Sequence, residues 1–388
     1  MARVLVAMSG GVDSSVAAAL LCEQGHEVTG VHLKLADVPA DRQVSGHGCC
    51  TLDDAQDARR VAGLLGIPFY VWDLAETFDR EVQAPFAGAY ARGVTPNPCV
   101  TCNERVKYAA LLERAVASGF DALATGHHAR LRRAGAPVRE PAGGQAGGTG
   151  PGGRVDLVRA ADAGKDQSYV LWMASPWQLA HTLLPVGEFT KGAVRDLADD
   201  LGFRVAAKPD SHDICFVPDG DTAGYLAERL PPAPGPIVDL DGTVLGEHDG
   251  VWRFTVGQRR GLGLAAGPSA DDGRPRRRFV VDIDAVRSTV VVGPREALAC
   301  HWAELADVSW TRGSAPTGPV RVQVRAHGAT VPGRVRQGPD EVVRLELDEP
   351  VHGLAPGQSA VVYDVADEVC LGGGRIDRAE RPVALPVV

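Results

Sequence analysis

The stretch that most constrains the fold of this chain lies close to its N-terminal end, at residues 4–15. The apolar run Val4-Leu5-Val6-Ala7-Met8 has the composition of a buried parallel strand. It ends at Ser9-Gly10-Gly11, where the glycines permit a tight turn and a close approach of the backbone to a ligand. Asp13-Ser14-Ser15 then begins a helical run. A strand, a glycine-rich turn and a helix N-terminus present N–H groups to an anion, so this stretch predicts a nucleotide site.

Two familiar phosphate loops are excluded by the same residues. A Walker A loop requires a lysine directly before its Ser or Thr, and Val12-Asp13 stands there instead. A dinucleotide fingerprint requires a third glycine a few residues further along, and none follows. The alternative that these residues leave open is a tight strand-to-helix turn of any Rossmann-like domain.

Length, composition and charge limit the class of protein. The chain has 388 residues, of which 45% are hydrophobic, so two or three domains with buried cores are expected. No apolar run approaches the roughly 20 residues of a membrane span, and no signal peptide precedes the first strand, so we expect a cytoplasmic protein. The net charge of −9 argues against a general nucleic-acid binder. It allows a local basic face, and arginines cluster at 130–133, 259–260 and 274–278.

Strand and helix patterns alternate from the start of the chain to about residue 205. Further strands are predicted at 27–35, 68–72, 121–125 and 155–160. Helices are predicted at 51–65, 76–92 and 106–116. This alternation predicts an α/β fold with a doubly wound parallel sheet, whose ligands bind at the carboxyl ends of the strands.

The second half of the chain has a different pattern. A glycine-rich insertion at 134–153 cannot bury enough apolar surface to fold and is predicted to be a surface loop. After residue 210, and especially after the proline cluster at 231–236, short β-like runs alternate with turns. They predict two smaller β-rich domains, the last a β-barrel. The predicted domains are 1–209, 210–288 and 289–388.

The chain has eight cysteines, and one pair forms a C-x-x-C sequence at Asn97-Pro98-Cys99-Val100-Thr101-Cys102-Asn103. Structural disulfides are unexpected in a cytoplasmic chain. Zinc would need a second pair of ligands, which Cys49-Cys50 with His47 could supply, although adjacent cysteines suit a tetrahedral site poorly. A thioredoxin-like pair would belong to a smaller fold. The third interpretation is a catalytic thiol, because Cys102 is predicted close to a helix N-terminus, which lowers the pKa of a thiol.

A second thiol of interest is Cys215, which follows Asp210-Ser211-His212-Asp213-Ile214. It is predicted to lie in a strand between apolar residues, where a buried structural cysteine is the ordinary interpretation. The acidic residues and the histidine directly before it favour a functional role. Both interpretations remain open from these residues alone.

Several further sequences occur in a fixed order: T-G-H-H, G-K-D-Q-S-Y, D-S-H-D-I-C-F, F-T-V-G-Q-R-R-G-L, A-P-G-Q-S and C-L-G-G-G. With S-G-G-V-D-S and N-P-C-x-x-C-N they cover the chain from residue 1 to about 374. In this combination the chain closely resembles the tRNA-specific 2-thiouridylases. S-G-G-V-D-S resembles the PP-loop of ATP pyrophosphatases, the superfamily to which these enzymes belong.

The resemblance implies an enzyme that uses ATP and Mg²⁺ to replace the C2 oxygen of the wobble uridine in tRNAs for Lys, Glu and Gln with sulfur. It implies that the uridine oxygen is adenylated and that AMP and pyrophosphate are released. Asp13 is a plausible Mg²⁺ contact by its chemistry, and no protein metal site is expected. The residues implied to bind ATP are Ala7, Met8, Ser9, Gly10, Gly11, Val12, Asp13, Ser14, Leu33 and Gly126.

The resemblance also assigns roles to the two thiols. Cys215 corresponds to the persulfide carrier, loaded by a sulfur donor protein such as a cysteine desulfurase or a sulfur relay protein. Cys102 corresponds to the thiol that attacks the persulfide and leaves a Cys102–Cys215 disulfide. The residues implied to contact tRNA are Asn97, Pro98, Cys99, His127, Lys165, Asp166, Gln167, Arg325 and Gln358.

Two positions depart from the family pattern. Some members carry an acid/base Asp where this chain has Cys99, so Cys99 is placed at the site without a role. Members often carry R-Y-R followed by a polar residue where this chain has Arg325-Ala326-His327-Gly328. Only Arg325 keeps the expected residue type.

Two other functions compete with this one. Another PP-loop ligase or synthetase, acting on a small molecule, would share the nucleotide loop but needs no paired thiols. A non-catalytic nucleotide-binding regulator needs neither the thiols nor a third domain. Cys102 and Cys215 therefore separate the thiouridylase from both alternatives.

Overall fold

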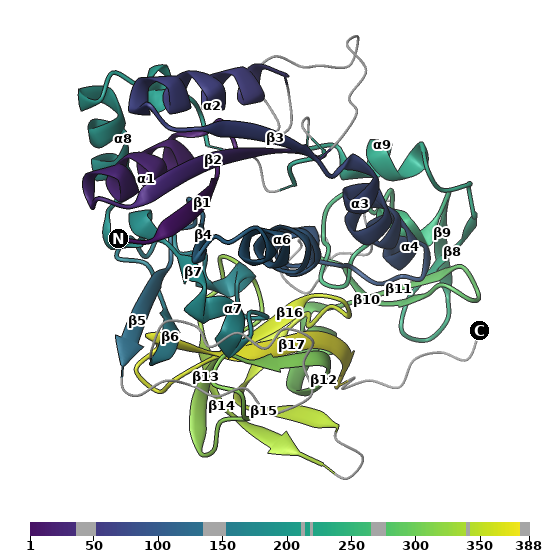
Figure 1. Ribbon diagram of the computed structural model, residues 1–388. Helices are drawn as coiled ribbons and strands as arrows, with labels where there is room; N and C mark the ends of the chain where they lie inside the picture. Colours follow the sequence, from purple (N-terminus) through teal and green to yellow (C-terminus); the bar gives the residue numbers. More distant parts are fainter. Residues whose placement is uncertain are drawn as a thin grey trace.

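The computed structural model describes residues 1–35, 52–134, 153–210, 214–217, 220–264, 277–338 and 342–380 (Figure 1). The predicted glycine-rich insertion, apart from its end residues Ala134 and Gly153, lies outside these residues. So do His47, Cys49 and Cys50 of the zinc alternative, His212, and Arg274 and Arg276 of the arginine cluster at 274–278. None of the helices in the described ranges is both long enough and apolar enough to span a membrane.

The first half of the described chain contains a parallel five-stranded sheet in the order β3-β2-β1-β4-β7. Its strands are β1 (Arg3–Ala7), β2 (Glu27–Lys34), β3 (Phe69–Asp73), β4 (Ala122–Ala124) and β7 (Thr182–Leu183). The strands predicted at 4–8, 27–35, 68–72 and 121–125 are therefore confirmed, and so is the parallel α/β fold. The carboxyl ends of β1 and β4, which are neighbours, meet at one edge of the sheet.

Both faces of this sheet are covered, which explains the uninterrupted apolar run of β1. Val4 and Val6 pack against Val16 of α1 (Val12–Glu23) on one face. Leu5 belongs to the cluster on the other face, with Leu111 and Leu112. Alternate side chains of a strand point to opposite faces, so a strand buried on both sides needs apolar residues throughout. Figure 1 shows α1, α2 and α8 gathered on one side of the sheet and α6 on the other.

The helical segments of this half follow the predicted order. Those on the α1 side are α2 (Leu52–Leu65) and α8 (Lys191–Asp200). The others are α3 (Ala75–Phe78), a π-helical stretch (Asp79–Gln83), α4 (Ala84–Ala91), α5 (Pro98–Thr101), a π-helical stretch (Cys102–Leu112), α6 (Glu113–Ala117) and α7 (Pro176–Ala180).

The helix predicted at 106–116 begins earlier, at Pro98. The side-chain oxygen of Asn97 accepts hydrogen bonds from the N–H groups of Cys99 (3.1 Å) and Val100 (3.3 Å). Asn is a preferred N-cap residue, and proline is favoured at the first helical position because its missing N–H is not needed there. The sequence Asn97-Pro98 is therefore a helix start that the prediction overlooked.

A second, four-stranded sheet lies in the middle of the described chain, in the order β10-β11-β8-β9. Its strands are β8 (Gly235–Val238), β9 (Val244–His248), β10 (Phe279–Asp284) and β11 (Thr289–Gly293), and the short α9 (Thr222–Ala227) precedes them. The predicted limit between residues 288 and 289 falls inside the β10–β11 hairpin, where Asp284 pairs with Thr289. We propose a limit after Gly293, because it keeps all four strands together.

The third region is a closed β-barrel, as predicted. Its strands are β12 (Ala299–Trp310), β13 (Pro319–Gln323), β14 (Val331–Gln337), β15 (Val343–His352), β16 (Ser359–Tyr363) and β17 (Val369–Ala379). They pair in the order β12-β15-β14-β13-β16-β17, and β12 also pairs with β17. That last pairing closes a six-stranded barrel in the part of the chain the structure describes.

The barrel is joined firmly to the first half of the chain. β5 (Arg130–Ala134) and β6 (Arg154–Val158) form a hairpin, and β6 pairs with β17 through Leu157 and Cys370. The cluster beneath the parallel sheet also includes Val361 and Tyr363 of the barrel. One apolar core therefore runs from the sheet into the barrel.

The loop that precedes α5 contacts both β-rich regions. The N–H of Thr95 donates to the carbonyl of Pro356 (2.9 Å), and its hydroxyl donates to that of Thr255 (3.1 Å). Gln358 donates from Nε2 to the carbonyl of Thr95 (2.9 Å). All three regions thus meet at the loop that leads into the C-x-x-C sequence.

This junction gives a first prediction. A Cβ added to Gly357, which has φ of +91°, would lie 2.5 Å from Val94 and 2.8 Å from the carbonyl oxygen of Thr95. Gly318 has φ of +88° and nothing within 4 Å. In both Gly→Ala variants the left-handed backbone conformation destabilises the folded state by about 1–2 kcal/mol. Only Gly357→Ala also displaces the loop at Val94 and Thr95. We expect Gly357→Ala to lower the melting temperature clearly more than Gly318→Ala in thermal unfolding. Equal decreases would contradict this account of the junction.

Candidate functional site

The predicted nucleotide loop closes on itself at the N-terminus of α1. The hydroxyl of Ser14 accepts from the N–H of Ser9 (3.1 Å) and donates to the carbonyl of Gly11 (3.2 Å). The two hydroxyls of Ser9 and Ser14 lie 3.2 Å apart. These bonds fix the turn between β1 and α1, and the first N–H groups of the helix have no partner within the helix. The residues therefore fit a phosphate group.

Two glycines permit the close backbone packing around this turn. Gly10 has φ of +80°, and a Cβ on it would lie 2.3 Å from the carbonyl oxygen of Asp54. A Cβ on Gly126, which follows β4, would lie 2.6 Å from the backbone nitrogen of Ser14. Gly126 thus lies directly against the start of α1, as expected for a residue at the nucleotide site. Leu33, at the carboxyl end of neighbouring β2, is buried.

Asp13, on the first turn of α1, is held by two basic residues. Its two carboxylate oxygens each lie 2.7 Å from Nζ of Lys191, and Nε2 of His128 lies 3.0 Å from Oδ1. Burial raises the pKa of Asp13, but the hydrogen bonds from His128 and Lys191 outweigh burial and hold the pKa below its ordinary value. Asp13 is therefore ionised at neutral pH.

A second carboxylate, Asp210, shares Lys191 with Asp13. It lies 3.0 Å from Lys191, 2.8 Å from Lys165 and 2.7 Å from Arg195. Burial raises the pKa of Asp210, but hydrogen bonds from Lys165 and Lys191 have the larger effect and hold the pKa well below its ordinary value. Asp13 and Asp210 are consequently joined through a single ammonium group.

Lys208 attaches the same segment to the loop from the other side. Its Nζ lies 3.1 Å from the carbonyl oxygen of Gly10, 2.6 Å from Asp54 and 3.1 Å from Asp57. Burial lowers the pKa of Lys208, but the hydrogen bonds that it donates to the two aspartates raise the pKa above the ordinary value. Residues 208–210 therefore lie against the nucleotide loop.

His127 is a neutral imidazole at neutral pH. Its Nδ1 lies 2.7 Å from the hydroxyl of Thr125, and its Nε2 lies 3.3 Å from Nζ of Lys107. Burial, followed by the positive charges of Lys107 and His128, places the pKa of His127 well below its ordinary value. Because Lys107 donates to Nε2, Nδ1 carries the proton and donates to Thr125.

The two thiols of interest belong to one packed region. Cys102 is 8% exposed and lies in the cluster beneath the sheet, and the half-buried Cys215 packs against that cluster. They are thiols, not joined by a disulfide bond, in this structure. The ring of Phe216, next to Cys215, makes edge contacts with Phe78 (5.7 Å) and Phe86 (5.3 Å).

Two local predictions about the thiols are wrong. Cys215 lies in a turn, closed by the N–H of Val217 donating to the carbonyl of Ile214 (3.1 Å), and not in a strand. Because the helix begins at Pro98, Cys99 occupies its first turn and Cys102 lies beyond it. The effect of a helix N-terminus falls off within one turn, so it acts on Cys99 more than on Cys102.

The residues predicted to contact tRNA have partners within the chain. Asp166 accepts from Arg159 (2.7 Å) and from the hydroxyl of Ser168 (2.8 Å). Gln167 accepts from the N–H of His128 (2.8 Å), which fixes the T-G-H-H turn. Arg325 donates to the carbonyls of residues 352 (2.9 Å) and 353 (3.3 Å). These bonds hold the loops in place and do not by themselves indicate a ligand.

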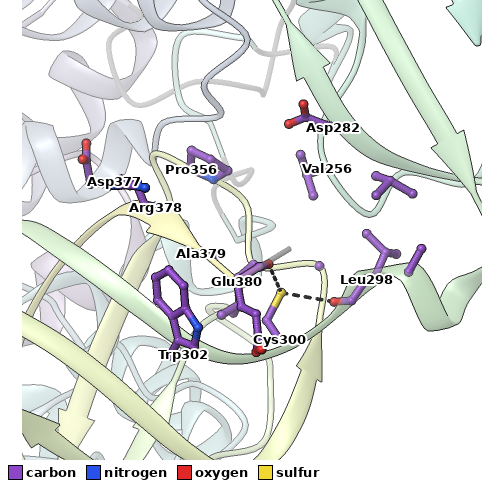
Figure 2. Close-up of a pocket in the computed structure, with 14 residues that line it drawn as sticks. Val256, Asp282, Leu298, Cys300, Trp302, Pro356, Asp377, Arg378, Ala379 and Glu380 are labelled. Atoms are coloured by element: carbon purple, nitrogen blue, oxygen red, sulfur yellow. Dashed lines mark hydrogen bonds between the residues drawn. The ribbon is translucent and has the colours of Figure 1, made fainter. Parts of the chain in front are cut away.

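A cavity of about 450 Å³ lies elsewhere, between the middle sheet and the barrel (Figure 2). It is lined by Val256, Leu298, Trp302 and Glu380, among others, and by none of the predicted site residues. The thiol of Cys300 donates to the carbonyls of Leu298 (3.3 Å) and Glu380 (3.2 Å), as the dashed lines in Figure 2 show. The candidate site is therefore the loop region and not this cavity.

Sequence reasoning missed most of the basic side chains at the site. Lys107, His128, Lys191 and Lys208 are brought in by the fold from four separate elements. Of these four residues, only His128 was indicated by the sequence, as part of T-G-H-H. Within the described residues, no group of three His, Cys, Asp or Glu side chains is arranged to hold a metal ion. Asp13 in particular has both oxygens on Lys191, so it would have to exchange partners to bind Mg²⁺.

Three domain families match the chain in order. Residues 2–219 match the tRNA methyl transferase HUP domain, residues 223–294 the tRNA methyl transferase PRC-barrel domain, and residues 302–376 the aminomethyltransferase beta-barrel domain. These matches cover the parallel-sheet region, the middle sheet and the barrel, respectively.

Relatives match over nearly the whole chain. The tRNA-specific 2-thiouridylase MnmA of Acidothermus cellulolyticus is 52% identical over 381 residues, covering 98% of this chain and 98% of that protein. Its counterpart in Kineococcus radiotolerans is 53% identical over 367 residues, covering 93% and 95%. A solved complex of a 4-thiouridine synthetase with RNA and bound ATP is 15% identical with a TM-score of 0.34, covering 56% and 45%. The domain matches and the two full-length relatives show that the chain belongs to the tRNA-specific 2-thiouridylase family.

Proposed function

We propose that the chain is a tRNA-uridine 2-sulfurtransferase. It uses ATP to replace the C2 oxygen of the wobble uridine, position 34, in tRNAs for Lys, Glu and Gln with sulfur. The observation that carries this proposal is a closed PP-loop at the start of α1 together with two thiols in one packed region, in a chain from this family. A small-molecule ligase of the same superfamily would need the PP-loop alone.

The PP-loop carries out the first step. The N-terminus of α1 binds the triphosphate, and Gly10 and Gly126 allow the close backbone packing that holds this turn in place. The uridine O2 attacks the α-phosphorus, the bond to the β-phosphate oxygen breaks, and pyrophosphate leaves. The oxygen thereby becomes part of a good leaving group, AMP. A bound Mg²⁺ would neutralise charge on the phosphates, and Asp13 is the nearest carboxylate on the loop.

The thiols carry out the second step. A sulfur donor protein loads Cys215 with one sulfur atom, and the terminal sulfur of this persulfide attacks C2 of the adenylated uridine and expels AMP. The thiolate of Cys102 then attacks the inner sulfur of Cys215. This breaks the bond to the transferred sulfur, which stays on C2, and forms a Cys102–Cys215 disulfide. A dithiol reductant restores both thiols for the next cycle.

The tRNA is bound around the junction that leads into α5. Asn97, Pro98 and Cys99 form the start of α5, and His127 contacts Lys107 of the stretch that follows α5. Gln358 of the barrel is hydrogen-bonded to the loop before α5. Lys165, Asp166, Gln167 and Arg325 are the further tRNA contacts we propose. Extruding the wobble base from the anticodon stack would let C2 reach the thiols. The expected compartment is the cytoplasm, where tRNA and ATP are available.

A prediction for the thiols follows. Cys102→Ser and Cys215→Ser each abolish formation of 2-thiouridine, because each removes one sulfur of the transfer chain. Both keep tRNA-dependent release of pyrophosphate, which needs only the PP-loop, and AMP then leaves when water attacks the adenylated uridine. Nucleoside mass spectrometry and thin-layer analysis of radiolabelled ATP measure the two products. Cys22→Ser, on the far part of α1, is the matched control and keeps both activities. Full thiolation by either active-site variant would contradict its assigned role.

A further prediction concerns the nucleotide. Gly126→Ala places a Cβ against the backbone of Ser14 and forces α1 away from β4, so we expect the KM for ATP to rise about tenfold or more, equivalent to about 1.4 kcal/mol. Gly63→Ala, inside α2 with nothing within 4 Å, is the control. Initial rates of pyrophosphate release over a range of ATP concentrations measure the effect. An unchanged KM in Gly126→Ala would remove this glycine from the ATP site, and ADP as a product would exclude the PP-loop chemistry.

A further inference from the structure

The segment that carries Cys215 is attached to the nucleotide loop by ion pairs. Asp210 lies five residues before Cys215 and binds Lys191, Lys165 and Arg195 at 2.7–3.0 Å. Lys208, two residues earlier, binds the carbonyl of Gly10 in the loop itself. Five residues span at most about 18 Å, so this anchor limits how far Cys215 moves from the loop.

Lys191 is the central member of this group. Its side chain is 12% exposed, and its Nζ contacts both oxygens of Asp13 and one oxygen of Asp210. Asp13 is on the first turn of α1, and Asp210 leads into the Cys215 turn. Any movement of α1 on binding or cleavage of ATP would therefore reach Asp210 through the Nζ atom of Lys191.

The other side of Cys215 is also fixed. The ring of Phe216 packs on Phe86 (5.3 Å) and Tyr225 (5.2 Å), and through Phe86 on the middle region. Cys215 therefore lies between an ionic anchor at the PP-loop and an aromatic anchor against α4 and α9. Only the ionic anchor touches the ATP site.

We propose that Asp210 and Lys191 are positioning residues that couple ATP cleavage to sulfur transfer. Neither contributes an atom to the reaction. They attach the segment that leads to the Cys215 turn to the PP-loop, so that the persulfide meets the adenylated uridine before water does. This inference rests on the proposed function and assigns a role to two residues outside its thiols and PP-loop.

The alternative is that the ion pairs only stabilise the fold. Partly exposed pairs contribute little individually, about 0–1 kcal/mol. A purely structural role would lower the melting temperature and reduce both products in parallel. A coupling role would leave AMP formation in place and reduce the amount of 2-thiouridine formed per AMP.

The experiment measures this ratio in a single turnover. The full-length chain is mixed with radiolabelled ATP, unmodified tRNA for Glu, and a cysteine desulfurase with cysteine as the sulfur source. Asp210→Asn removes the charge without changing the shape, and Asp210→Glu restores the charge. Lys191→Met is the second variant, and Asp200→Asn, an exposed aspartate on the same helix as Lys191, is the matched control.

We expect Asp210→Asn to release pyrophosphate at near the normal rate and to yield about tenfold less 2-thiouridine per AMP, since small displacements of a reacting group have large effects. Asp210→Glu and the control should keep a ratio close to that of the unmodified chain. A normal ratio in both Asp210→Asn and Lys191→Met would overturn the coupling role, as would a parallel loss of both products with a lower melting temperature. Failure of the unmodified chain to form AMP or 2-thiouridine would instead refute the proposed function.

Discussion

The rest of the structure depends on the close contact of backbone with backbone at the start of α1. Gly10 lies against the carbonyl of Asp54, and Gly126 lies against the nitrogen of Ser14, with no room for a side chain at either place. This contact joins the carboxyl ends of β1 and β4 and leaves the helix N-terminus facing outward. An anion site results from geometry alone, and the charged residues around it then determine what it does. Asp13 is paired with the ammonium group of Lys191 and contacts His128, so the loop does not repel a triphosphate as strongly as an isolated carboxylate would.

Residues that are far apart in the sequence come together around the start of α1. Cys102 comes from the helix under the sheet, Cys215 from a turn after the last helix of the first region, and Gln358 from the barrel. The shared cluster beneath the sheet and the loop at Thr95 hold them together. The barrel is therefore part of the framework that fixes the C-x-x-C helix, in addition to any role as a tRNA-binding surface. The barrel and the middle sheet have apolar clusters of their own, and the cluster beneath the parallel sheet joins the barrel to the first region.

The sequence was most informative where the signal is local. The apolar run of β1, the glycines after it and the alternation of strands and helices predicted the parallel sheet and the position of its ligand site. The short β-like runs predicted the barrel.

The start of the helix at Pro98 was missed although Asn97-Pro98 is a good cap, because the apolar periodicity begins only later. The turn at Cys215 was missed because apolar neighbours suggested a strand, whereas Phe216 in fact packs against Phe78 and Phe86. Lys107, Lys191 and Lys208 were unpredictable, since their importance arises only from contacts with residues 20 to 198 positions away.

The central claim is that this chain inserts sulfur at C2 of the wobble uridine. The most direct test is mass spectrometry of nucleosides from tRNAs for Lys, Glu and Gln, isolated from cells that lack this protein and from the same cells after its gene is restored. The account predicts that 2-thiouridine at the wobble position disappears in the first sample and returns in the second. A normal content of 2-thiouridine in cells without the protein would contradict it.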